Sequence, residues 1–267
     1  MIALDFDPLL RLGGFDIRWQ TLGVAVALLA GVGLAARGRG RAALPLDDMA
    51  FILLAAVPGA VLGGRLVHGI VFWEFYSAAP ARLLDPAAGS LSLLGAVLGG
   101  ALTAAAMARL LRAPVRRWAD SAAVPLLVAL GLGKLAQLLG GSGQGLPFDG
   151  PWAVAFVGPG PWISAIPAMP AHPAQVYEGL SLLIGAGLLG ILGRPRLTGR
   201  AGWLFVCTLT VFLLGRLIVG FSWRDEPLVG PLNAEQLLAL LGLAAVALGL
   251  AVSARRARYR VAGRSLP

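Results

Sequence analysis

Long apolar stretches, separated by short polar segments, are the dominant pattern of this chain. Each stretch approaches the ~20 residues that a helix needs to cross the hydrocarbon core of a bilayer. The pattern predicts seven transmembrane helices, at residues 20–36, 49–75, 89–111, 119–140, 173–193, 201–221 and 233–253. The expected fold is therefore an all-α polytopic membrane protein, a seven-helix bundle forming a single integral membrane domain over residues 1–267. The longest connection, residues 141–172, is expected to be an irregular loop.

Composition agrees with a membrane setting, since 58% of the 267 residues are hydrophobic and only 13% are charged. The net charge of +9 would suggest nucleic acid as the partner of a soluble protein, but the positions of the cations argue against it. Of the 22 Lys and Arg, fifteen follow the first, third, fifth and seventh stretches: Arg37, Arg39, Arg41, Arg109, Arg112, Arg116, Arg117, Arg194, Arg196, Arg200, Arg255, Arg256, Arg258, Arg260 and Arg264. The positive-inside rule then places the N-terminus outside and the C-terminus in the cytoplasm. The basic segments are also expected to attract anionic membrane lipids, whereas no cofactor or metal ion is expected.

Three cations, Arg65, Lys134 and Arg216, lie inside apolar stretches. A charge near the bilayer centre costs roughly 3 kcal/mol on insertion scales, so such residues are candidates for a functional site. Glu178 is the best-embedded acid, and pairing with it leaves about two positive charges over. That surplus predicts an external anion, and the abundant anion of a membrane is a phospholipid phosphate. The alternatives are a purely structural ion pair of Arg65 or Arg216 with Glu178, and a Lys134 that extends to the outer interface.

The most specific string is His172-Pro173-Ala174-Gln175-Val176-Tyr177-Glu178, which opens the fifth stretch. Proline suits the first turn of a helix, where its missing N–H costs nothing. The string therefore predicts a helix start that carries three polar side chains, Gln175, Tyr177 and Glu178, at headgroup depth.

At this motif the chain resembles the bacterial prolipoprotein diacylglyceryl transferases, which carry His-Pro-Ser-Gln-Leu-Tyr-Glu there. Further matches fall in the same order along the chain: Phe6-Asp7-Pro8, Gly63-Gly64-Arg65, Gly215-Arg216 and Gln236. The resemblance implies a multi-pass enzyme of the bacterial cytoplasmic (inner) membrane. It would move the diacylglyceryl group of phosphatidylglycerol to the lipobox cysteine in the signal peptide of a prolipoprotein, and glycerol phosphate would leave.

For that reaction, negative charge on the phosphate must be held as the C–O bond breaks, and the thiol must lose its proton. The expected phosphate and substrate ligands are Arg65, Lys134, Arg216, Gln137, Gln175 and Tyr177. His172 or Glu178 is expected to take the proton, and Arg216 to stabilise the departing phosphate. His68 follows Arg65 by three positions, on the same helix face, and is an alternative base. The competing interpretation is that His68 is a structural histidine, whose ring nitrogens are hydrogen-bonded at the interior or interface of the bundle.

The chain also departs from the family pattern. Lys134 stands where the family has arginine, which keeps the charge and loses the fork of donors. The other departures are Gln137 for asparagine, Gly140 for asparagine, Ser142 for glutamate, Leu94 for histidine and Gln20 for tyrosine. These losses favour the alternative function, a catalytically inactive or acceptor-shifted paralogue that binds phospholipid or lipoprotein signal segments. Glu235, which follows Asn233, is interpreted as a first-turn acid without a role in the chemistry.

Overall fold

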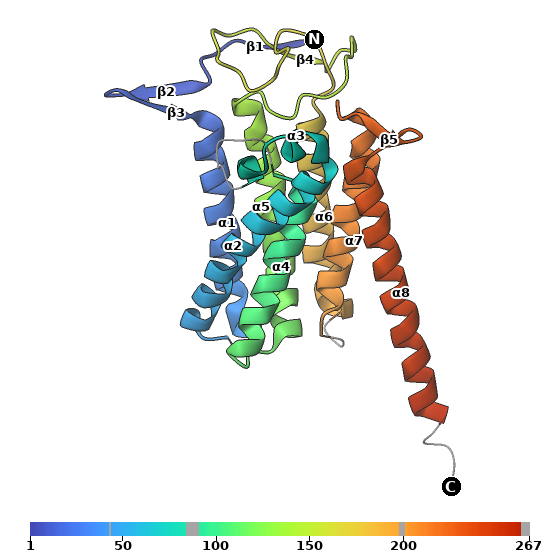
Figure 1. Ribbon diagram of the computed structural model, residues 1–267. Helices are drawn as coiled ribbons and strands as arrows, with labels where there is room; N and C mark the ends of the chain where they lie inside the picture. The colour runs from blue at the N-terminus through green and yellow to red at the C-terminus, as the bar shows by residue number, and fades with distance from the viewer. Residues whose placement is uncertain (43, 84–90, 198–200, 263–267) are drawn as a thin grey trace.

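The computed structural model describes residues 1–42, 44–83, 91–197 and 201–262. Within these ranges, seven helices are long and apolar enough to cross a membrane, which confirms the predicted number of spans and a multi-pass membrane protein. They run side by side as a bundle (Figure 1). Their bounds are α1 Trp19–Ala42, α2 Leu46–Val71, α4 Leu93–Leu110, α5 Val115–Ala136, α6 Ala174–Leu197, α7 Trp203–Val219 and α8 Ala234–Ala262.

Glycines allow α2 and α4 to pack with their backbones almost in contact. A Cβ added at Gly63 would lie 2.4 Å from the carbonyl oxygen of Gly95, and one at Gly99 would lie 2.2 Å from that of Gly59. Small residues that permit such close approach are the usual means by which membrane helices associate, because lipid tails provide no hydrophobic force between helices. A larger side chain at Gly63 or Gly99 would therefore separate these helices.

The larger of two apolar core clusters in the described residues lies between α4, α5, α6, α7 and α8. Its buried members include Leu94, Leu127, Leu182, Phe212 and Leu213. The many large apolar side chains on the outside of the bundle are suited to contact with lipid tails.

The expectation of an all-α chain needs correction at one end of the bundle, where short strands form (Figure 1). Strand β1 (Ile2–Leu4) pairs in parallel with β4 (Val154–Phe156), inside the loop expected to be irregular. Strands β2 (Leu9–Leu12) and β3 (Phe15–Arg18) form a hairpin, and β5 (Pro227–Val229) pairs with β6 (Leu232–Asn233). The two-residue hairpin turn at Gly13 and Gly14 has positive φ at both positions, which glycine adopts without a steric cost.

The helix ends also differ from the predicted spans. The stretch predicted at 49–75 divides into α2 and the short helix α3 (Trp73–Ser77), which is followed by the 3-10 turn η1 (Pro80–Leu83). Helix α4 begins only after Ser92, whose side chain accepts a hydrogen bond from the Gly95 N–H and caps the helix; the predicted start at residue 89 lies outside the described residues. Helices α5 and α7 each continue into a 3-10 turn, η2 (Gln137–Leu139) and η3 (Gly220–Ser222).

Candidate functional site

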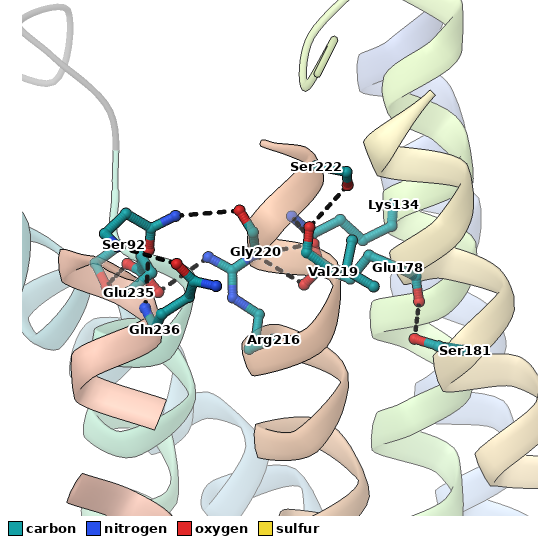
Figure 2. Close-up of polar contacts among 11 residues, drawn as sticks. Ser92, Lys134, Glu178, Ser181, Arg216, Val219, Gly220, Ser222, Glu235 and Gln236 are labelled. Carbon is teal, nitrogen blue, oxygen red and sulfur yellow. Dashed lines mark hydrogen bonds and ion pairs between the residues drawn. The ribbon is translucent and has the colours of Figure 1, made fainter. Parts of the chain in front are cut away.

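Four charged side chains form a continuous chain of ion pairs at one end of the bundle, with Arg216 between two carboxylates (Figure 2). Its Nη1 donates to both oxygens of Glu178 at 2.9 Å, and its Nη2 donates to Oε2 of Glu235 at 3.0 Å. The Nζ of Lys134 lies 2.9 Å from Oε2 of Glu178. Two cations and two acids make the network formally neutral, which is how charges can be buried at an acceptable cost.

Alternating helix directions bring these residues together. Lys134 and Arg216 lie in the last turns of α5 and α7, whereas Glu235 lies in the first turn of α8. Glu178 is the fifth residue of α6. Each cation therefore lies at the negative end of a helix dipole and Glu235 at a positive end, which stabilises both kinds of charge.

The network extends to α4 and α2 through Ser92. The Ser92 hydroxyl donates to Oε1 of Glu235 at 2.5 Å. The backbone N–H of Ser92 donates to the carbonyl oxygen of Gly64 at 3.1 Å, which fixes the start of α4 beside the α2 residue that precedes Arg65. Arg65 is itself buried. The structure therefore holds all three predicted in-span cations in the interior, near the same end of the bundle.

Trp223, just after η3, covers the two network cations. Its ring centroid is 4.5 Å from Nζ of Lys134 and 5.8 Å from Cζ of Arg216, within the range of cation–π attraction. The ring also lies against Gly143, where an added Cβ would be 2.9 Å from it. Gly143 has a φ of +76° and so accommodates both the turn and the indole.

Several buried polar atoms around the network have no hydrogen-bond partner among the described residues. They are Nε of Arg216, Nε1 of Trp223, Oε1 of Gln137 and both amide atoms of Gln175. Gln175 is fully buried. An unsatisfied buried donor or acceptor costs about 1–3 kcal/mol, so such a group marks a place where a polar ligand or water gains hydrogen bonds.

The connection between α7 and α8 is held by a reciprocal cap. The backbone N–H of Asn233 donates to Oε1 of Gln236, and the backbone N–H of Gln236 donates to Oδ1 of Asn233. Nε2 of Gln236 also donates to the carbonyl oxygen of Leu217 in α7 at 3.0 Å. The family residue Gln236 thus fixes the first turn of α8, and with it Glu235, against the helix that carries Arg216.

His172 belongs to an aromatic cluster at the start of α6. Its ring is stacked on Phe148 with centroids 4.0 Å apart, and its Nδ1 is 3.1 Å from the Tyr177 hydroxyl. The same hydroxyl accepts a hydrogen bond of 2.7 Å from Nε1 of Trp152. Tyr177 therefore orients His172, and among the described residues no hydrogen bond or ion pair joins either of them to the ion-pair network. His68 has a comparable partner, because its Nδ1 lies 3.0 Å from the Tyr76 hydroxyl in α3.

Three expectations about charge are corrected by this geometry. Glu235 is a first-turn acid, as predicted, and it is also a member of the ion-pair network. Because it pairs with Arg216, the surplus of two positive charges expected from Glu178 alone does not arise. Lys134 does not extend to the interface, since its side chain is buried against Glu178.

Apart from Lys134 in the network and Gln137 beside it in the chain, the departures from the family pattern fall into two places. Gln20, Gly140 and Ser142 meet: the Ser142 hydroxyl donates to Oε1 of Gln20 at 2.8 Å, and a Cβ at Gly140 would be 2.2 Å from that oxygen. Leu94 instead packs in the apolar core beside Leu127. The position that the resemblance gives to a histidine is therefore an apolar one in this chain.

The carboxyl of Asp225, in the loop after η3, is influenced by the same network. Partial loss of hydration raises the pKa of Asp225, the positive charge of Arg216 opposes that rise, and the negative charge of Glu235 adds to it. The network thus acts electrostatically on a loop outside the spans.

Comparison with known proteins gives a family and named relatives. A model of the prolipoprotein diacylglyceryl transferase family matches residues 8–252. A phosphatidylglycerol–prolipoprotein diacylglyceryl transferase of Geobacter sulfurreducens is 33% identical over 254 residues, which cover 89% of this chain and 93% of the relative. The protein of the same name from Symbiobacterium thermophilum is 31% identical, with 90% and 92% covered, and that from Nostoc sp. is 29% identical, with 91% and 87% covered.

Proposed function

The chain belongs to the prolipoprotein diacylglyceryl transferase family, and on that premise we propose that it transfers the diacylglyceryl group of phosphatidylglycerol to the lipobox cysteine of a prolipoprotein. The observation that carries the proposal is the buried pair Lys134 and Arg216, held beside polar atoms that lack partners. This combination suits an anionic headgroup that bears hydroxyl groups.

Arg216 and Lys134 hold the phosphate in this proposal. As the thiolate sulfur forms its bond to the terminal glyceryl carbon, the C–O bond to the phosphate breaks, and its electron pair remains on glycerol phosphate. Buried cationic donors stabilise that developing charge far better than water does. Arg65 supports the same phosphate from α2, and Gln137 and Gln175 supply amide groups to the headgroup.

His172 is the proton acceptor in the proposed mechanism. If Nδ1–H donates to the Tyr177 oxygen, Nε2 is left as the acceptor, and the second hydrogen bond of Tyr177 from Trp152 holds the arrangement. Glu178 is less suited to this role, because Lys134 and Arg216 already occupy its oxygens. His68 is the alternative base, close enough to Arg65 and Glu235 for their charges to act on it.

We place the protein in the bacterial cytoplasmic membrane as a single integral domain, with the N-terminus outside. The ends of α1, α4 and α8 that lead into the Arg-rich segments all point away from β1, toward the opposite side of the molecule (Figure 1). The positive-inside rule puts that end in the cytoplasm and the ion-pair network near the outer surface. Reporter fusions after Arg41 and Arg117 are expected to give a cytoplasmic signal, and a periplasmic signal at either would overturn this orientation.

The proposed activity is tested with the purified protein, phosphatidylglycerol and a lipobox peptide. The expected product is a peptide whose cysteine carries the mass of a diacylglyceryl group. Complementation of a bacterium that lacks its own transferase, with lipoprotein lipidation followed by mass shift, tests the same proposal in cells.

A second function is favoured by the apolar surroundings of Leu94 and by the neutral contact of Gln20 with Ser142. In this alternative, the protein binds phospholipid or a lipoprotein signal segment without transfer, or serves another acceptor. Binding of phosphatidylglycerol with no turnover of any thiol peptide decides for the binding protein, whereas turnover of a peptide without a lipobox decides for an altered acceptor.

A further inference from the structure

The two carboxylates that pair with Arg216, Glu178 and Glu235, differ in their hydrogen bonds and in their exposure. Glu178 accepts from Lys134 and twice from Arg216, and its side chain is 1% exposed. Glu235 accepts one hydrogen bond from Arg216 and one from the neutral hydroxyl of Ser92, and its side chain is 18% exposed. Charge-assisted bonds are roughly twice as strong as neutral ones, so Glu235 is the carboxylate that moves more easily.

The donors of Arg216 show what such a movement would release. Nε is buried and has no partner among the described residues, while Nη2 is held by Glu235. Nε and Nη2 share one edge of the guanidinium, the edge that gives two parallel hydrogen bonds to a phosphate or a carboxylate. Nη1, which Glu178 holds, is not needed for that contact.

We propose that Glu235 is the displaceable counter-ion of Arg216, which holds the Nε–Nη2 edge in position and yields it to a phosphate. The inference rests on the proposed function, because it takes the phosphate of a lipid or of glycerol phosphate as the competing anion. Glu178 remains the fixed counter-ion throughout. Glu235 is a positioning residue, since it acts on the substrate through Arg216.

This arrangement has a consequence for turnover. Glycerol phosphate leaves with more negative charge than the lipid phosphate had, so a site with only cations would retain it. The return of Glu235 to Arg216 competes with the product and hastens its release. Removal of the Glu235 charge should therefore strengthen anion binding and slow turnover at the same time, which loss of a merely structural residue would not do.

The test is equilibrium binding of glycerol phosphate to the full-length protein in phosphatidylcholine nanodiscs, with steady-state transfer from phosphatidylglycerol as the second measurement. We expect E235Q to lower the dissociation constant on the order of tenfold, the effect of one charge at several ångströms in a partly exposed site, and to lower both KM and kcat. The matched control is E226Q, an exposed acid in the loop between α7 and α8 that changes the net charge equally. It should leave the dissociation constant within twofold of wild type.

A second variant keeps the proposal testable if E235Q does not fold. Ser92→Ala removes one of the two bonds that hold Glu235 and should lower the dissociation constant two- to threefold, in the same direction. Weaker or unchanged binding in E235Q or S92A would overturn the displacement and leave Glu235 as an orienting residue. If the wild type binds neither glycerol phosphate nor phosphatidylglycerol, the proposed function is overturned, and the proposed displacement of Glu235 with it.

Discussion

Two polar clusters at the same end of the bundle bury their side chains in different ways. The charged cluster of Lys134, Glu178, Arg216 and Glu235 takes one residue from each of α5, α6, α7 and α8, and every charge has a partner. The neutral cluster joins Gln20 of α1 to Ser142 through a single hydrogen bond, next to Gly140, where no side chain has room.

The clusters also differ in their relation to the family pattern. In the charged cluster, Arg216 and Glu178 match the motifs of the family and Lys134 keeps the positive charge of its arginine. In the neutral cluster, Gln20, Gly140 and Ser142 all depart from the pattern. The departures contact one another, and so they form one local replacement rather than three scattered losses. The charged cluster thus keeps the cations that the proposed phosphate contact needs, whereas the region between α1 and η2 has lost the polar side chains of the family pattern.

The largest effect is expected from Glu178→Gln, which breaks the charged cluster. The substitution leaves the buried Lys134 without its ion-pair partner and Arg216 with Glu235 alone. Loss of one partner of a buried ion pair costs about 3–5 kcal/mol. Thermal unfolding in detergent should show a clearly lower midpoint, with E226Q as the matched control. A midpoint close to that of wild type would mean that the network contributes little to the fold.

Replacement of Arg216 by lysine should act on the chemistry of the same cluster. Lysine keeps the charge, but it cannot donate along a planar edge to phosphate while it also bonds Glu178. We expect transfer from phosphatidylglycerol to fall ~10²-fold or more, as when a preorganised donor to a developing charge is removed. The control is binding of a zwitterionic phospholipid, which should change little; equal losses for both lipids would assign Arg216 a structural role.

Histidine substitutions compare the two candidate bases. His172→Ala should lower the transfer rate ~10²-fold, the lower range for a lost general base, and His68→Ala should change it only a few fold. The measurement is the initial rate of peptide lipidation as a function of pH, since loss of a base also removes its limb from the profile. If His68→Ala has the larger effect, the proton acceptor lies on α2 rather than at the start of α6.

The smallest effect is expected in the neutral cluster. Ser142→Ala removes one neutral hydrogen bond and should cost about 1 kcal/mol of stability, with the rate of transfer from phosphatidylglycerol unchanged. Denaturant titration and the lipidation assay, each run beside wild type, measure the two quantities. A large loss of transfer in S142A would show that this cluster takes part in the reaction and would remove the distinction between the two regions.

Much of this architecture was readable from the sequence, because apolar length alone predicts a membrane helix. That rule predicts the seven spans. The free-energy cost of a charge inside a span marks Arg65, Lys134 and Arg216 as candidate site residues. The role of Glu235 could not be predicted in this way, since an acid after a capping Asn233 is explained by helix-end chemistry alone, and only the packing of α8 against α7 brings it to Arg216. Asn233 and Gln236 do carry a readable signal, the spacing of a reciprocal cap.

Other features required the three-dimensional arrangement. The hairpin at residues 9–18 has a Gly-Gly turn that predicts it, but its strands are short and lie beside a span whose apolar signal dominates. Trp223 resembles any interfacial tryptophan in sequence, and its position over two cations depends on the turn at Gly143. The contact between Gln20 and Ser142 joins residues far apart in the chain, which no local pattern reveals.

The length of α8 links the site to the thickness of the bilayer. Its membrane-spanning part, Ala234–Arg256, has 23 residues and is roughly 35 Å long, whereas the hydrocarbon core measures about 30 Å. Its first turn is pinned to α7 by Asn233 and Gln236, and its far end leans away from the bundle (Figure 1). A change of membrane thickness alters the tilt of such a helix. Glu235 lies in the first turn of α8, the end that is fixed to α7. We therefore expect membrane thickness to influence the Arg216–Glu235 ion pair through the tilt of α8.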